Sequence, residues 1–457
     1  MHAVKILEGP FDWQILQQEN GFATAHLKCE IILNDEEIAK YNNVYAFCRV
    51  VDMASGSRVG TPAKAKITRG GEIVEFNLKI AAGGPYRIET YLRRGVSNEC
   101  SGDRRANIGV GDIYLIAGQS NAVGNGRDLF CEESDNSLHL FRKNGKWAKA
   151  EHPIFESTDQ VFGYPDSSGY SPWITFGKIL SKRVGYPIGF IPAAVGGTHL
   201  MFWDRQQSNP HLFNNMLKMI EAAGVTDIKG ILWYQGCNDA ETHTGTEKYL
   251  EMFKRIYADF ETIFHKNIPL LSVQLNKIVC YKDGDLDRLG KGLADIRDAQ
   301  RRAANKIENV FIVPSIDLPV CDGIHNSGMS NSVIGQRLAD LASKYIYNKN
   351  IICDAPQISE IKAEGNIVTL YFDNVYDGLF SDLNNTNTLL FSLYDGEDRL
   401  FPTDYKCEEN KIILTFERDI KMGAYISCDR YNESGLIAYD LYSYLPFIPF
   451  NKEYVKF

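Results

Sequence analysis

Five short apolar runs in the middle of the chain alternate with longer stretches of helical period, and this alternation limits the possible folds more than any other feature. We interpret the apolar runs as strands, at Ile113 to Ala117, Ile188 to Ala193, Gly230 to Tyr234, Pro269 to Leu275 and Val310 to Pro314. Helices are expected near residues 173–184, 211–223, 246–264, 293–307 and 331–347. Strands that alternate with helices are typical of βαβ units. We therefore predict an α/β domain on an open, parallel, five-stranded sheet.

The two ends of the chain have a different pattern. Residues 1–107 and 351–457 contain short β-rich runs, such as Ile73 to Ile80 and Ile367 to Phe372, separated by Gly, Ser and Asn. Several short strands at such spacing are typical of β-sandwiches. We predict sandwich-like units at 1–107 and 351–457, on either side of an α/β domain at 108–350.

Composition excludes some classes of function. Lys and Arg total 49 against 58 Asp and Glu, a net charge of −9 in 457 residues, and no basic patch for nucleic acid is found. No apolar run approaches the length of a membrane span, so neither nucleic acid nor a membrane is expected as a partner. The 10 cysteines are dispersed and the N-terminus lacks signal-peptide features, so we expect a cytoplasmic location. Removal of a segment ahead of Met1 would change this expectation to a secreted or periplasmic one.

No metal site is expected. The cysteines and histidines do not cluster at ligand spacing. The triplet Asp283-x-Asp285-x-Asp287 resembles a calcium loop, but Arg288 stands where Gly is needed and Ala294 where Glu is needed. We interpret the triplet as a solvated loop.

Polar residues follow four of the predicted strands, where open α/β sheets bind ligands. The first strand leads into Gly118-Gln119-Ser120-Asn121-Ala122, which places Ser120 in a tight turn where a nucleophile or a helix cap could stand. A glycine pair, Gly196-Gly197, follows the second strand, and the side-chain amides of Gln235 and Asn238 follow the third.

An Asp-x-x-His pair follows the last strand. Asp322 and His325 stand three residues apart in a loop that contains Gly323. At this spacing the carboxylate can accept the imidazole Nδ1–H, which leaves Nε2 free to take a proton from a serine hydroxyl. Each residue alone has a simpler explanation as a turn or cap, whereas the ordered set predicts acyl-transfer chemistry.

In this order the blocks resemble those of the SGNH hydrolase superfamily, closest to its sialate O-acetylesterase and carbohydrate acetylesterase branch. The matching blocks are Gly118-Gln119-Ser120-Asn121, Gly197, Gly236-x-Asn238-Asp239 and Asp322-x-x-His325. The segment Tyr431 to Leu436 near the C-terminus is a weaker cue. Relatives usually have Gln-Gly-Glu in the third block, whereas this chain has Cys237 in place of the Glu.

The resemblance implies a flavodoxin-like domain and a serine esterase without a cofactor. Ser120 would be the nucleophile, His325 the base and Asp322 the residue that orients it. The oxyanion would be bound by the N–H groups of Ser120 and Gly197 and by the amide of Asn238, with Gln235 as the alternative donor.

The expected substrate is an O-acetylated sugar, first of all an O-acetylated sialic acid. Acetylated xylan or another polysaccharide ester is the alternative, as is a glycan-binding protein without activity. Residues considered for contact with the sugar are Arg127, Arg205, Trp203, Trp233 and Tyr234. Cys237 lies beside the site and is an alternative nucleophile, although a packing role is favoured.

Overall fold

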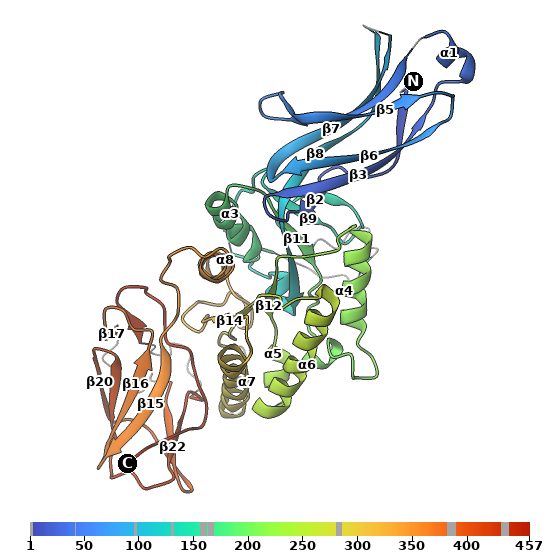
Figure 1. Ribbon diagram of the computed structural model, residues 1–457. Coiled ribbons are helices and arrows are strands. Elements are labelled where there is room, and N and C mark those ends of the chain that lie inside the picture. Colours follow the sequence, from blue (N-terminus) through green and yellow to red (C-terminus); the bar gives the residue numbers. More distant parts are fainter. Residues whose placement is uncertain are drawn as a thin grey trace.

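The computed structural model shows three units along the chain (Figure 1). It describes residues 3–41, 43–95, 98–128, 132–155, 162, 169–279, 286–381, 390–430 and 438–457. An N-terminal β-unit and a C-terminal β-unit lie at opposite sides of a central α/β unit (Figure 1). Within the described ranges, no helix is long and apolar enough to cross a membrane.

The central sheet contains all five expected strands: β8 (Asn98–Gly118), β11 (Ile188–Pro192), β12 (Gly230–Tyr234), β13 (Leu270–Val273) and β14 (Val310–Val313). They run parallel in the order β11-β8-β12-β13-β14. The sheet is larger than predicted, because β9 (Leu138–Phe141) pairs parallel with β11 and β10 (Trp147–Lys149) pairs antiparallel with β9. The expectation of a sheet with five strands alone is therefore corrected.

The short strand β9 escaped the sequence pattern for a physical reason. Its four residues, Leu-His-Leu-Phe, are all buried, and the histidine interrupts the apolar run. His139 is tolerated inside because its Nδ1 hydrogen-bonds to the carbonyl oxygen of Trp13 at 2.8 Å. Burial lowers the pKa of His139 to about 4 and favours its neutral form.

Helices cover both faces of the central sheet (Figure 1). The long ones are α3 (Trp173–Val184), α4 (His211–Ala222), α6 (Thr246–Phe264), α7 (Leu286–Lys306) and α8 (Gly328–Tyr345). Short helices follow three strands: α2 (Ser120–Val123), η1 (Leu200–Phe202) and α5 (Cys237–Glu241). Helices α3 and α8 pack together, and α6 and α5 pack on α7.

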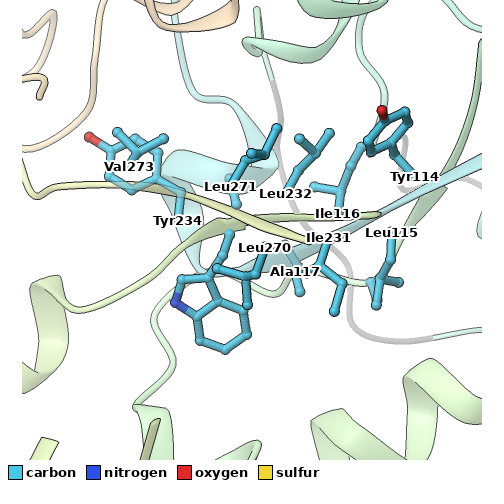
Figure 2. Packing of buried hydrophobic residues seen from close by; sticks show 14 of the residues in the cluster. Tyr114, Leu115, Ile116, Ala117, Ile231, Leu232, Tyr234, Leu270, Leu271 and Val273 are labelled. Atoms are coloured by element: carbon cyan, nitrogen blue, oxygen red, sulfur yellow. The ribbon is translucent and has the colours of Figure 1, made fainter. Parts of the chain in front are cut away.

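Aliphatic side chains of the neighbouring strands β8, β12 and β13 form the centre of the core (Figure 2). Leu115 pairs with Ile231, which pairs with Leu270, and all three are fully buried. Each such side chain contributes roughly 1.5–3 kcal/mol on leaving water. This rigid sheet fixes the strand ends from which the polar residues project.

The N-terminal unit is made of two facing sheets. One contains β1 (Val4–Glu8), β3 (Phe22–Ile31) and β6 (Ile73–Ala81). The other contains β4 (Val44–Asp52), β5 (Arg58–Ile67), β7 (Gly83–Arg94) and the first part of β8. Strand β2 (Ile15–Gln17) pairs parallel with β8, and the short helix α1 (Asp35–Ala39) follows β3. Alternation buries one side of β6 between the sheets. Strand β8 passes without interruption through the predicted boundary between residues 107 and 108.

The C-terminal unit has three small sheets around its own core, two of four strands and one of two. One contains β15 (Gln357–Glu364), β16 (Ile367–Asp373), β21 (Lys411–Thr415) and β20 (Asp404–Glu408). Another contains β19 (Asp398–Leu400), β18 (Ser392–Asp395), β22 (Tyr425–Ser427) and β24 (Glu453–Tyr454), and β17 (Leu379–Phe380) pairs with β23 (Tyr439–Asp440). The unit contacts α7 through Glu453, which pairs with Arg301, and through Asn451, which donates to Asp295 at 2.8 Å.

Candidate active site

Ser120 stands at the carboxyl end of the central strand β8. Gly118 before it has φ +134°, and a Cβ there would come within 2.1 Å of the Tyr234 carbonyl oxygen, so only glycine fits. Gln119 is the N-cap of α2 and Ser120 is its first residue. Ser120 is therefore not the helix cap that its sequence position also allowed.

Asn121 connects the serine turn to the histidine loop. Its Oδ1 accepts a hydrogen bond from the Asn326 backbone N–H at 3.0 Å, and its Nδ2 donates to the Ile324 carbonyl oxygen at 3.3 Å. Ile324 and Asn326 are the two neighbours of His325, and Asn121 is the neighbour of Ser120. The side chain is 2% exposed, so these bonds are shielded from water. This link brings Ser120 and His325 to the same part of the site.

Asp322 and His325 form the expected pair. The His325 Nδ1–H donates to Asp322 Oδ2 at 2.7 Å, and Asp322 Oδ1 accepts the backbone N–H groups of Ile324 and His325 at 3.1 and 2.9 Å. Burial alone would raise the pKa of Asp322, but the hydrogen bonds from His325 outweigh it and the pKa is lowered. The carboxylate therefore stays charged and fixes the tautomer in which Nε2 is free. No hydrogen bond joins Ser120 Oγ to His325 in the part of the chain that is described.

Three N–H donors near Ser120 lack an acceptor within the described ranges. They are the backbone N–H groups of Ser120 and Gly197 and the side-chain Nδ2 of Asn238. The Ser120 N–H has no intrahelical acceptor because this residue opens α2. Gly197 is exposed and has φ +66°, a conformation that glycine adopts without strain.

Gln119 fixes which way the Asn238 amide faces. The Gly236 backbone N–H donates to Gln119 Oε1 at 2.9 Å, so the amide nitrogen of Gln119 must lie on its other side. That Nε2 donates to Asn238 Oδ1 at 2.8 Å. The Nδ2 of Asn238 consequently points away from Gln119 and is available as a donor.

Gln235, the alternative oxyanion donor, is committed elsewhere. It is fully buried, and its Nε2 donates to Asp239 Oδ2 at 2.7 Å and to the Thr198 carbonyl oxygen at 3.3 Å. Its Oε1 accepts from the Tyr249 hydroxyl at 2.8 Å. The amide nitrogen of Gln235 is therefore occupied, whereas the Nδ2 of Asn238 has no acceptor among the described residues.

Cys237 is not arranged as a nucleophile. Burial raises the pKa of its thiol to about 12, so the thiolate is not populated near neutral pH. Its described contact is the weak hydrogen bond from Asn121 Nδ2 at 3.9 Å. The thiol is a packing group at the start of α5.

The aromatic residues considered for sugar contact lie in the core. Trp203, Trp233 and Tyr234 are all 0% exposed, so no ring face is open to a sugar. Trp203 packs edge-to-face on Trp233, with ring centroids 5.5 Å apart. The prediction that these rings contact substrate is wrong, because their apolar bulk fills the interior beneath the site.

The two candidate arginines differ. Arg205 contacts Asp259 of α6 at 3.5 Å and lies over the Phe213 ring of α4, so its described partners belong to the outer helices. Arg127 is exposed on the loop after α2, and the described residues give it no ion pair. Arg127 stays a prediction as a substrate contact.

Two other sequence cues fall wholly or partly outside the described residues. These are Asp283 and Asp285 of the calcium-like triplet, and the segment Tyr431 to Leu436. Asp287 pairs with Lys291 and Arg399. Within the described ranges, no group of His, Cys, Asp and Glu could hold a metal ion.

Comparison with known proteins gives a consistent result. Residues 110–344, more than half of the chain, match the family model described as "Carbohydrate esterase, sialic acid-specific acetylesterase". An Arabidopsis thaliana protein named "Probable carbohydrate esterase" is 25% identical over 249 residues, 50% of this chain and 88% of that protein. The sialate O-acetylesterase of Homo sapiens is 25% identical over 263 residues, 46% of this chain and 48% of that protein.

A solved structure matches nearly the whole chain. A carbohydrate acetylesterase from Xanthomonas citri superposes with a TM-score of 0.62 at 20% identity, covering 97% of this chain and 98% of the other. At this identity the likeness shows the fold, including both flanking β-units. The chain spans about half the length of the human enzyme that it matches.

Proposed function

Since the chain belongs to the sialic acid-specific acetylesterase family of carbohydrate esterases, we propose that it removes O-acetyl groups from sialic acid. The family makes it a carboxylic ester hydrolase, and the proposed reaction passes through an acetyl-serine intermediate. The observation that carries the mechanism is the Asp322–His325 pair, joined by the Asn121 side chain to the turn that holds Ser120. This arrangement supplies a nucleophile, a base with a defined tautomer and a buried link between them.

The reaction has two steps. The Ser120 hydroxyl attacks the acetyl carbonyl carbon while His325 Nε2 takes its proton. The resulting imidazolium is stabilised by Asp322, which already accepts the Nδ1–H at 2.7 Å. His325 then gives the proton to the sugar oxygen as the C–O bond breaks, and water cleaves the acetyl-serine by the same route.

The oxyanion forms next to the three free donors. The N–H groups of Ser120 and Gly197 and the Nδ2 of Asn238 come from the ends of β8, β11 and β12, which are neighbours in the sheet. Donors already oriented by the fold need no reorganisation when the charge develops. Gln119 and Asn121 act as positioning residues, because they hold the donor and the histidine loop in place.

Sialic acid is favoured over other acetylated sugars by the family description and by the mammalian relatives, which are named sialate O-acetylesterases. Acetylated xylan is the alternative substrate. The test is acetate release from an O-acetylated sialic acid and from acetylated xylo-oligosaccharides, in wild type, Ser120→Ala and the matched surface control Ser208→Ala.

We expect the wild type and Ser208→Ala to deacetylate sialic acid at equal rates, and Ser120→Ala to lose roughly 10³-fold or more in kcat. A preference for xylo-oligosaccharides would refute the choice of sugar and keep the serine mechanism. Activity that survives in Ser120→Ala would refute Ser120 as nucleophile.

A further inference from the structure

A second histidine and carboxylate lie beside the oxyanion donors and take no part in the mechanism above. His199 follows Gly197 by two residues, and Asp239 is the residue after Asn238. The His199 Nδ1 lies 3.9 Å from Asp239 Oδ1. The two loops that supply oxyanion donors are therefore joined by this pair.

Asp239 is a buried carboxylate held by three donors. Its Oδ2 accepts from the Leu200 backbone N–H at 2.9 Å and from Gln235 Nε2 at 2.7 Å, and its Oδ1 accepts from Thr244 Oγ1 at 3.1 Å. Its side chain is 3% exposed, and His199 is its ion-pair partner in the described part of the chain. A buried carboxylate with a single cationic partner strongly favours the charged form of that partner.

His199 lies beside Asp239 and is partly exposed. The contact with the Asp239 carboxylate raises the pKa of His199 more than partial burial lowers it, and the charge of Glu241 adds to the rise. The Phe202 ring lies edge-on to the imidazole and also packs against the ring of His211. The His199 side chain is 29% exposed. The two nitrogens of an imidazole ring diverge, so with Nδ1 toward the buried carboxylate, Nε2 points away from Asp239.

We propose that His199, backed by Asp239, binds the carboxylate of an acidic acetylated sugar through Nε2–H and so selects anionic substrates. The proposal rests on the proposed function and adds the residue that recognises the negative charge of the sugar. Protonated His199 would place a positive charge beside the site in a chain of net charge −9, whose field otherwise disfavours an anionic substrate. A charge-assisted hydrogen bond from His199, two residues from Gly197, would act on binding of the sugar and leave the acyl chemistry unchanged.

The test compares the O-acetylated sialic acid with its carboxyl methyl ester, which has the same sugar without the charge. The readout is release of acetate by wild type and by His199→Gln, which keeps a polar side chain without a charge. We expect KM for the acid to rise about tenfold and kcat to change less than about twofold, with KM for the methyl ester unchanged. Equal effects on both substrates, or none on the acid, would overturn the proposal.

A second measurement separates this proposal from the choice of sialic acid as substrate. Free sialic acid is used as a competitive inhibitor of 4-nitrophenyl acetate hydrolysis, which requires only the serine machinery. We expect the inhibition constant to rise about tenfold in His199→Gln and to stay at the wild-type value in the surface control His265→Gln. Inhibition that is equally strong in His199→Gln would overturn the carboxylate contact even where Ser120-dependent hydrolysis is intact. Failure of wild type to hydrolyse 4-nitrophenyl acetate would instead refute the proposed function.

Discussion

Gln119→Glu is the change that tests the oxyanion site most sharply. The substitution is isosteric, and the introduced carboxylate would still accept the Gly236 N–H that Gln119 Oε1 accepts at 2.9 Å. Its second oxygen would then face Asn238 Oδ1, where the Gln119 Nε2 now donates at 2.8 Å. Two acceptors cannot share that contact without a proton. The Asn238 amide should therefore turn over, so that Nδ2 bonds the new carboxylate and Oδ1 faces the oxyanion.

The expected loss is that of one oxyanion donor, about 10²–10³-fold in kcat, or roughly 2.7–4 kcal/mol of transition-state stabilisation. The loss should depend on pH in a defined direction. Gln119 is 2% exposed, and burial raises the pKa of a carboxyl group placed there. Once protonated, the introduced carboxyl group could donate to Asn238 Oδ1 again, so the ratio of variant to wild-type kcat should recover as pH falls.

The assay is kcat on 4-nitrophenyl acetate for wild type, Gln119→Glu, Asn238→Ala and the double variant. Gln206→Glu, at an exposed glutamine, is the matched control and should keep wild-type kcat. If Gln119 acts through the Asn238 amide, the double variant should be no slower than Asn238→Ala. A full additional loss in the double variant, or wild-type kcat in Gln119→Glu, would refute the reasoning.

Three further predictions follow from other contacts. Asp322→Asn should lower kcat by roughly 10⁴-fold, because the amide no longer fixes the tautomer of His325. The pKa of Asp322 is lowered in the folded state, so its charged form adds stability that is lost as pH falls through that pKa. The free energies of unfolding of wild type and variant in urea should therefore converge in acid. Cys237→Ser should change kcat less than about twofold in the same assay, since its pKa of about 12 keeps the thiol neutral. Asp112→Asn should lower the free energy of unfolding in urea by about 2–4 kcal/mol. The buried carboxylate accepts four hydrogen bonds, from Gln17, Gln18, Tyr186 and Tyr347, and an amide nitrogen in place of one oxygen would leave about two of these donors without an acceptor. An unchanged unfolding midpoint would contradict this prediction.

The sequence predicted the parts of the fold that depend on local pattern. Helices expected at 173–184 and 246–264 match α3 and α6, because amphipathic period and end signals lie within the segment itself. The sixth parallel strand, β9, was missed because its burial depends on a distant partner, the Trp13 carbonyl oxygen that satisfies His139. Tertiary contacts of this kind leave no periodic signal in a four-residue strand.

The site shows the same division. The strand-end positions of Ser120 and the Asp322–His325 pair follow from chain order, whereas Gln119 and Asn121 were given no role. Their position beside Ser120 in one run of polar residues was the available signal. The sequence could not supply the orientation of the side-chain amides. Gln235 and Asn238 both follow β12, and only the hydrogen bonds from Tyr249 and Gln119 show which of the two amide groups has a free N–H. The same limit applies to Trp203, whose burial depends on the packing of Trp233.

The two β-units contact different parts of the catalytic unit, so we infer different mechanical roles for them. Asp112 lies where β8 enters the central sheet, far along the strand from Ser120, and its bonds to Gln17 and Gln18 brace the amino end. The C-terminal unit instead holds α7, and the chain between β13 and α7 includes Val279, whose N–H donates to the Gly323 carbonyl oxygen at 2.6 Å. Gly323 lies between Asp322 and His325. Because β8 belongs to both the N-terminal unit and the catalytic sheet, the strand that carries Ser120 cannot be separated from that unit without cutting the central strand itself.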